Sequence, residues 1–384
     1  MVGIRKMKYL IQILLLGMVA KIAIAGKSLP ITGEYSVGTK SYFIIDKNRS
    51  ETLTKNTKDY RRVGIQAFFP SFKTDECMNQ LDSPYGKKIK YIHCINKPIK
   101  PAIINEKYPV VILSPGFGGS YLMNLTLAEE LASHGYYVIN VGHTFFNSTP
   151  TFPDGKKIEL MSMDTLKMES DDFLNEEFKT RLNTYIKIQK DDILSILNEL
   201  ANTLDKDHLN SIDLNNIACI GYSGGGATSA EICSADTRIK AGININGILY
   251  GDGWNDSITQ PFLYINADYS DPKKAEIEMQ GGQNVIDSLL SYYNRRKLRF
   301  SKNSNADFYE LTLYNTTHQN FSDMALINQD YCGKSKPKKC FEYTYRYILL
   351  FLNKYLKKET SDELNQNNRT KAYYFEIIKT ASNN

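Results

Sequence analysis

The hydrophobic positions of this chain fall into short, continuous apolar runs that alternate with longer stretches of helical periodicity. Continuous apolar runs of this length are typical of strands that are buried on both faces of a sheet. We expect such strands at residues 109–113, 136–141, 217–220, 241–245, 261–265 and 308–314. Amphipathic patterns predict helices over residues 122–134, 182–204 and 341–356. The alternation predicts an α/β fold with a mostly parallel sheet that helices cover on both faces.

The segments outside this alternating part are more polar. Two strand-like runs, 39–45 and 62–69, are separated by lysine-rich sequence, which favours an antiparallel pair at a sheet edge. We expect one domain over residues 26–356, followed by a polar extension over 357–384. Residues 144–180 have an irregular pattern rich in methionine and aromatic side chains. They are expected to form either a lid over an apolar substrate or a surface excursion.

The first 25 residues differ from the rest in composition. Basic residues precede an apolar run over residues 9–20, and Ala23 and Ala25 provide a small-residue cleavage site. This pattern predicts a secretory signal peptide and a secreted or periplasmic protein. The alternative, an uncleaved membrane anchor, is less favoured because the apolar run is too short to span a bilayer.

Removing this segment changes the charge of the chain. The segment carries four basic residues and no acidic ones, so its loss lowers the net charge from +5 to +1. A nearly neutral chain gives no indication of a nucleic-acid partner.

Six cysteines follow the predicted signal peptide, and export would allow them to be oxidised. We expect Cys332 to pair with Cys340, because these two bracket a short polar insert, and Cys77 to pair with Cys94 in one loop-like region. The remaining two cysteines lie in predicted core elements and are expected to be buried free thiols: Cys219 and Cys233. Neither a C-x-x-C motif nor a histidine–cysteine cluster points to a metal site, and we expect no metal cofactor.

A glycine-flanked serine stands between one of the buried strands and a helix-like segment. The sequence Gly221-Tyr222-Ser223-Gly224-Gly225 has the form G-x-S-x-G, and it follows the apolar run 217–220 directly. Strand, sharp turn and helix are the context in which this motif presents a nucleophilic serine. The flanking glycines allow the strained turn, because a side chain there would collide with neighbouring backbone. The alternative is an ordinary tight turn, and the flanking elements favour the nucleophile.

A serine nucleophile needs a base and a site for the negative charge that develops on the substrate. Among the five histidines, only His318 follows the serine and lies just beyond a predicted strand, as the order serine, acid, histidine requires. The glycine-rich turn over residues 114–120 follows another buried strand and can aim backbone N–H groups at an oxyanion. By itself this turn would be read as a plain strand-to-helix connection.

Taken together, these motifs resemble the family of secreted platelet-activating-factor acetylhydrolases and related bacterial lipases, within the α/β-hydrolase superfamily. The matching segments are residues 33–38, 131–135, 211–213, 221–225 and 318–323, so the resemblance extends from about residue 30 to the final helix. It implies that Ser223 is the nucleophile, that His318 is the general base, and that the backbone N–H groups of Phe117 and Gly224 form the oxyanion hole. It also implies a lipid or short-acyl ester as substrate, phospholipids included.

The third catalytic residue departs from the family pattern. The position at which the family has its aspartate is Asn246 in this chain. An asparagine can hold an imidazole but cannot stabilise imidazolium by charge, and in a serine protease the equivalent change lowered turnover about 10⁴-fold. Asp268, one strand later, is our preferred substitute, and Asp252 is a weaker one. Partial deamidation at Asn246-Gly247 would be another source of a carboxylate.

We therefore expect a single α/β-hydrolase domain that is exported and hydrolyses carboxylic esters through a serine acyl-enzyme, with Asp268 orienting His318. A lipid substrate would bring the enzyme into transient contact with a membrane surface. Two alternatives stay open. The chain is either a catalytically weak or silent binding protein, as Asn246 suggests, or a peptidase or polymer esterase on the same fold.

Overall fold

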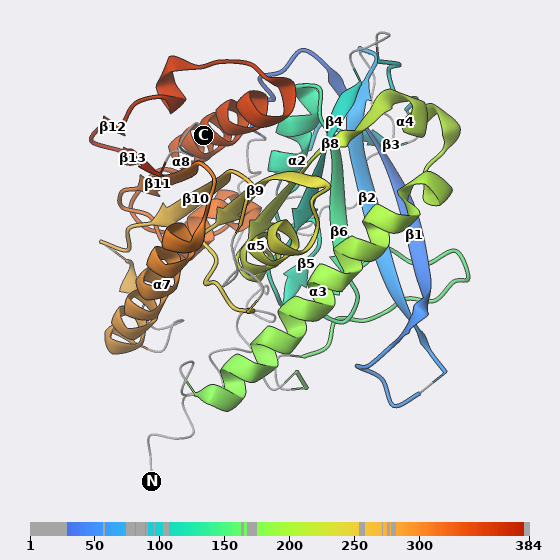
Figure 1. The fold of residues 1–384 in the computed structure, drawn as a ribbon, viewed down its shortest axis with the longest axis horizontal. Coiled ribbons are helices and arrows are strands. Elements are labelled where there is room, and N and C mark those ends of the chain that lie inside the picture. The colour runs from blue at the N-terminus through green and yellow to red at the C-terminus, as the bar shows by residue number, and fades with distance from the viewer. Residues whose placement is uncertain are drawn as a thin grey trace.

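The computed structural model describes residues 29–379, except for gaps at 57, 74–80, 82–88, 90, 96, 103–106, 163–164, 167–174, 253–257, 271, 275–276 and 278–281. The described residues form a sheet of 11 strands and a separate two-stranded pair (Figure 1). The large sheet contains β1 (Ser36–Ser50), β2 (Tyr60–Ser71), β3 (Cys94–Ile95), β4 (Tyr108–Ser114), β6 (Tyr137–His143), β8 (Ile212–Tyr222), β9 (Ile239–Ile245), β10 (Phe262–Ala267), β11 (Phe308–Leu313), β12 (Asn368–Arg369) and β13 (Tyr373–Lys379). The pair consists of β5 (Gly119–Ser120) and β7 (Asn147–Ser148).

The centre of the large sheet is parallel. Its strand order is β12-β13-β11-β10-β9-β8-β4-β6-β2-β1-β3, and the six strands from β11 to β6 are parallel to their neighbours. β4 and β6 are buried along their whole length, as the continuous apolar runs predict. Because parallel strands end at the same edge, the loops that follow β4, β8, β9, β10 and β11 meet there. The predicted α/β-hydrolase architecture is confirmed.

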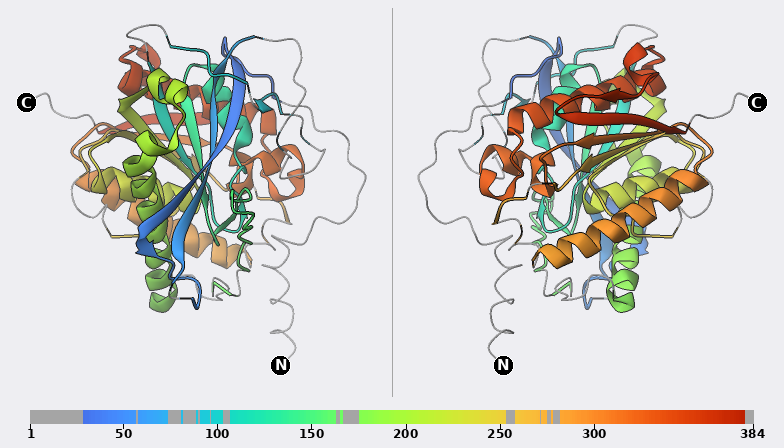
Figure 2. Two further views of the ribbon diagram at one scale, coloured as in Figure 1. Left: turned by 90° about the vertical axis from the view of Figure 1, so that its right-hand side faces the viewer. Right: turned by 90° about the vertical axis from the view of Figure 1, so that its left-hand side faces the viewer.

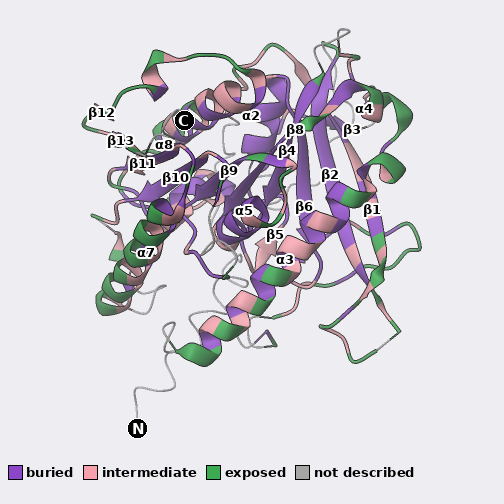
Figure 3. Cartoon of the chain, in the orientation of Figure 1, coloured by how far each residue is buried: buried purple, intermediate pink, exposed green. Residues whose placement is uncertain are grey.

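Helices cover both faces of the sheet. They are α2 (Leu125–Ser133), α3 (Glu176–Thr203), α4 (Lys206–Ser211), α5 (Gly224–Ala235), α7 (Gln283–Asn303) and α8 (Pro337–Leu352). Short turns of other helical types are η4 (His318–Phe321), η5 (Asp323–Leu326), η6 (Gln329–Tyr331), η7 (Asn353–Lys357) and η8 (Asp362–Leu364). α2 and α8 contribute to the core on one face, and α3, α5 and α7 to the core on the other. Figure 2 shows the sheet from its sides, and Figure 3 shows the buried strands between the helix layers.

The strands near one edge of the sheet were predicted from the sequence, whereas those near the other edge were not. β1 and β2 pair antiparallel in a long ribbon, which confirms the predicted pair of strands. At the opposite edge, β13 pairs antiparallel with β11, although residues 357–384 were expected to be a polar extension. Phe375 of β13 is fully buried, so this segment completes the core. In the described residues, no helix is both long enough and apolar enough to cross a membrane.

Candidate active site

Ser223 lies in the sharp turn between β8 and α5, with φ +57° and ψ −123°. This conformation is uncommon for a residue with a side chain and is held by the surrounding backbone. The Ser223 N–H donates to the Ile245 carbonyl at 3.0 Å. A Cβ on Gly221 would lie 1.7 Å from the Gly225 carbonyl oxygen, and a Cβ on Gly225 would lie 2.1 Å from the Ser114 carbonyl oxygen. The glycines of the motif are therefore required by close backbone approach.

His318 reaches this serine from the loop that follows β11. Its Nε2 lies 3.0 Å from Ser223 Oγ, and its ring stacks on Tyr222 with the ring centres 4.9 Å apart. The Tyr222 hydroxyl donates to the His318 carbonyl at 3.1 Å, which holds the backbone as well. Burial lowers the pKa of His318 to about 4, and the contact with Asn246 opposes this only in part. The imidazole is therefore neutral at pH 7, as a general base must be.

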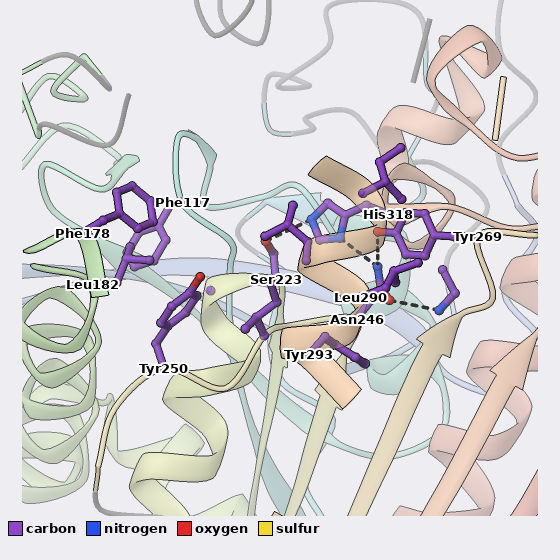
Figure 4. A pocket seen from close by; sticks show the side chains of 15 residues that line it. Phe117, Phe178, Leu182, Ser223, Asn246, Tyr250, Tyr269, Leu290, Tyr293 and His318 are labelled. Carbon is purple, nitrogen blue, oxygen red and sulfur yellow. Dashed lines mark hydrogen bonds between the residues drawn. The ribbon is translucent and has the colours of Figure 1, made fainter. Parts of the chain in front are cut away.

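Asn246 occupies the position next to the histidine. It follows β9, and its backbone has φ +50°. Its Nδ2 lies 2.9 Å from His318 Nδ1 and donates to the Tyr269 hydroxyl at 3.2 Å. Its Oδ1 accepts from the Ala267 N–H at 2.9 Å. Figure 4 shows the resulting chain of contacts from Ser223 through His318 to Asn246.

Asp268 and Asp252, the two carboxylates expected to be candidates for this role, have other contacts. The Asp268 carboxylate accepts from the Thr316 N–H at 3.2 Å and from the hydroxyl and N–H of Ser270. Asp252 accepts from Asn183 of α3 at 3.4 Å. Among the described residues, neither carboxylate is hydrogen-bonded to His318. The structure therefore brings Ser223, His318 and Asn246 together and leaves both aspartates outside the group.

The two predicted oxyanion donors lie beside the serine. Phe117 is in the turn after β4, where a Cβ on Gly116 would lie 2.8 Å from Ser223 Cβ. A Cβ on Gly224 would lie 2.6 Å from the Phe117 ring. Gly224 directly follows Ser223 and is the first residue of α5. That the N–H groups of Phe117 and Gly224 bind a substrate oxyanion stays a prediction.

A cavity of about 240 Å³ opens at these residues. Among the described residues that line it, the polar groups come from the serine, the histidine, the asparagine and tyrosine hydroxyls, and none of these residues is charged. α3 contributes Phe178 and Leu182, whereas α7 contributes Ile286, Leu290 and Tyr293. Phe178 falls inside the segment 144–180 that was expected to be either a lid or a surface excursion. The cavity is therefore mostly apolar, and Ser223 and His318 are among its few polar lining residues.

Residues 32–372 match the family model described as "Platelet-activating factor acetylhydrolase, isoform II". The chain belongs to this family. The bovine (Bos taurus) platelet-activating factor acetylhydrolase is 27% identical over 245 residues, which cover 59% of this chain and 51% of the relative. The chicken (Gallus gallus) protein of the same name is 23% identical over 295 residues, covering 68% and 64%. The chain therefore spans less than two thirds of the length of these relatives.

A solved structure supports the fold assignment. A ferulic acid esterase from Streptomyces cinnamoneus matches with a TM-score of 0.68 and 20% identity, covering 89% of this chain and 96% of that one. At this identity, the similarity shows a shared fold and no more.

A buried network braces the turn that carries Phe117. Asn147 donates through Nδ2 to the Gly116 carbonyl at 2.6 Å, and the Gly118 N–H donates to the Phe146 carbonyl at 2.9 Å. His143 Nε2 lies 3.0 Å from Ser114 Oγ. Residues 143–147, at the end of β6 and just after it, thus hold both sides of this turn. His143 itself is fully buried and lies outside the cavity lining.

Behind His143 lies a set of buried charges that sequence reasoning missed. His143 Nδ1 lies 2.9 Å from Asp192 Oδ2, and Asp192 also accepts from Arg61 and Arg49. Arg61 donates in turn to Glu51 at 2.9 Å. Although burial alone would raise the pKa of Asp192, the charge and hydrogen bonds of Arg61 hold it well below its usual range. Arg61 and Asp192 are 131 positions apart, so no local pattern indicated this network.

The prediction of a disulfide between Cys332 and Cys340 was wrong. Cys332 and Cys340 are not disulfide-bonded in the structure, so the expected bridge between them is absent. Each thiol is buried and faces a backbone carbonyl, that of Asn328 for Cys332 and that of Asn320 for Cys340. Cys94 is disulfide-bonded, but Cys77 lies outside the described residues, so their pairing stays a prediction. The remaining two cysteines are buried free thiols as expected: Cys219 and Cys233.

Proposed function

We propose that this protein is a serine hydrolase that cleaves carboxylic esters, with Ser223 as nucleophile and His318 as general base. The observation that carries this proposal is the 3.0 Å contact between His318 Nε2 and Ser223 Oγ in the lining of a mostly apolar cavity. Membership of a family whose named relatives are acetylhydrolases supports an ester substrate.

The reaction follows from the positions of these groups. Ser223 Oγ bonds to the ester carbonyl carbon while its proton passes to His318 Nε2. The carbonyl oxygen becomes an oxyanion that accepts from the N–H groups of Phe117 and Gly224. The carbon–oxygen bond to the alcohol then breaks, and the leaving oxygen takes the proton from His318. Water repeats the sequence on the acyl-enzyme, releasing the acid and restoring Ser223.

The cavity supports a lipid or short-acyl ester as the substrate class. Its walls are aliphatic and aromatic, so burial of an acyl chain would stabilise binding by about 0.8 kcal/mol for each methylene group. No cation is among the described residues that line it, so we expect an anionic headgroup to remain at the mouth. We also propose that the protein is exported, which rests on the composition of residues 1–25.

Asn246 favours a second candidate function, a hydrolase-fold protein that binds esters with little or no turnover. Such a protein would keep the cavity and the serine but would lack charge stabilisation of the imidazolium. A fluorophosphonate probe separates the two candidates, because covalent labelling requires an activated serine and binding does not.

The test is hydrolysis of p-nitrophenyl esters of graded chain length, together with fluorophosphonate labelling and peptide mapping. We expect Ser223→Ala to lower turnover by roughly 10²-fold or more and to abolish the label. Ser234→Ala is the matched control, because Ser234 lies on the same helix and donates to the Glu231 carbonyl. Unchanged hydrolysis in Ser223→Ala would refute the proposal.

A further inference from the structure

The side-chain amide of Asn246 is fixed in one orientation by its neighbours. The Ala267 N–H can only donate, and it lies 2.9 Å from the amide oxygen. The amide nitrogen therefore faces the opposite way, toward His318 Nδ1 and the Tyr269 hydroxyl (Figure 4). Rotating the amide by half a turn would set two donors, Nδ2 and the Ala267 N–H, against each other. The hydrogen-bond network thus assigns the oxygen and nitrogen positions.

This orientation determines which ring nitrogen of His318 carries the proton. An amide NH₂ group donates and does not accept, so Nδ1 of the neutral imidazole has to accept from Asn246. The single ring proton is then on Nε2, which lies 3.0 Å from Ser223 Oγ. In this tautomer Nε2 donates to the serine and has no lone pair to take its proton. General-base catalysis needs the opposite tautomer.

We propose that Asn246 is a positioning residue that holds His318 in the tautomer with the proton on Nε2, so that the wild-type protein is a slow hydrolase which Asn246→Asp would accelerate. The inference deepens the proposed function and rests on it, since it concerns the same serine and histidine.

The surroundings of His318 offer no substitute for the missing carboxylate. Among the described residues, the ring of His318 contacts Ser223, Asn246 and the stacked ring of Tyr222, and none of these three carries a carboxylate. Tyr269 reaches the histidine through Asn246. The tautomer needed for catalysis and the imidazolium formed during attack are therefore both left without stabilisation by charge.

An aspartate fits position 246 without rearrangement of its neighbours. One carboxylate oxygen would accept from the Ala267 N–H, as Oδ1 of Asn246 does now. The other would take the place of Nδ2 and accept from His318 Nδ1–H and from the Tyr269 hydroxyl. All three neighbours can act as donors to a carboxylate, so the substitution turns an inhibitory contact into a supporting one.

The experiment compares kcat and KM of wild type, Asn246→Asp, Asn315→Asp and the double variant Asn246→Asp/Ser223→Ala on a short-chain p-nitrophenyl ester. We expect Asn246→Asp to raise kcat by about 10²- to 10⁴-fold with little change in KM. Asn315→Asp is the matched control, because it adds the same charge near His318 but on an exposed loop residue. Its kcat should stay within about twofold of wild type.

Two outcomes would overturn the inference about Asn246, and a third would overturn the proposed function. If kcat of Asn246→Asp is unchanged or lower, the inference is wrong, whereas the proposed function still stands as long as Ser223→Ala is inactive. If Asn315→Asp is as strongly activated as Asn246→Asp, the gain comes from charge in general and the inference again falls. If the double variant keeps the elevated activity, Ser223 is not the nucleophile and the proposed function fails.

A measurement on the wild type covers the case in which Asn246→Asp does not fold. Long-range proton–nitrogen NMR of protein labelled with ¹⁵N-histidine reports which ring nitrogen is protonated, and the spectrum of His318→Gln identifies the signals of His318. We expect the proton on Nε2 at pH 7. A proton on Nδ1 would overturn the inference.

Discussion

The contacts that hold the turn carrying Phe117 can be tested by removing the side chain of Asn147. Asn147 donates to the Gly116 carbonyl at 2.6 Å, directly before Phe117, whose N–H is one of the two proposed oxyanion donors. In Asn147→Ala this carbonyl loses its partner, while the Gly118 N–H still donates to the Phe146 carbonyl. The turn therefore keeps one of its anchors, and Phe117 is expected to shift without unfolding.

The magnitude follows from these contacts. Complete loss of an oxyanion donor costs about 10²- to 10³-fold in kcat, and a displacement of about 1 Å can cost about 10²-fold. Because the turn remains held on one side, we expect Asn147→Ala to lower kcat by about 10- to 100-fold with little change in KM. The unpaired carbonyl should also lower the free energy of unfolding by about 1–3 kcal/mol.

The assay is steady-state hydrolysis of a short-chain p-nitrophenyl ester, with urea unfolding measured in parallel. Asn140→Ala is the matched control, because Asn140 on β6 is, like Asn147, a fully buried asparagine, and neither atom of its amide has a hydrogen-bond partner among the described residues. This control should keep kcat within about twofold of wild type. If Asn147→Ala loses stability but keeps its kcat, the contact between Asn147 and the Gly116 carbonyl is structural and has no part in catalysis.

Three further predictions concern the histidine loop and the end of β9. Because burial lowers the pKa of His318 to about 4 and the neutral ring is the base, activity should fall only as the pH drops through about 4, and this limb should move to higher pH in Asn246→Asp. Asp268→Ala should lower the free energy of unfolding by about 1–3 kcal/mol through loss of the Thr316 contact while changing kcat less than tenfold, and a collapse of kcat would return Asp268 to the catalytic group. Asn246 should resist deamidation in the folded protein, because the Gly247 N–H is bonded to Asn244 at 2.7 Å, and a mass gain in its peptide after prolonged incubation would contradict this.

The parts of the fold that could be predicted from the sequence are those in which one local signal determines the outcome. The parallel strands are buried on both faces, so their apolar runs are continuous and readable. β13 was missed because it lies next to the sheet edge inside a polar segment, and only its alternate residues, such as Phe375, enter the core. The nucleophile turn was found because its strain demands glycines at fixed offsets from Ser223.

The polar networks could not be predicted, because they join residues that are distant in the sequence. The contact between Arg61 and Asp192 depends on how β2 and α3 pack across the sheet, which no window of sequence contains. The expected disulfide between Cys332 and Cys340 failed for a related reason. Their short separation is compatible with a bridge, but Cys332 follows η6 and Cys340 lies on α8, and the two thiols face different backbone carbonyls.

Asn246 is the clearest case of a residue that the sequence located but whose contacts only the structure revealed. The sequence located it at the position of the family's aspartate, but Asp268, one strand later, was the preferred acid while side-chain directions were unknown. The structure separates the two residues by their partners, since Asp268 accepts from the histidine loop's backbone and Asn246 contacts the imidazole itself. What decides the chemistry is a third group, the Ala267 N–H, whose donor character fixes the amide and through it the proton of His318. A backbone N–H carries no signature in the sequence, so the tautomer of the catalytic histidine follows only from the folded arrangement.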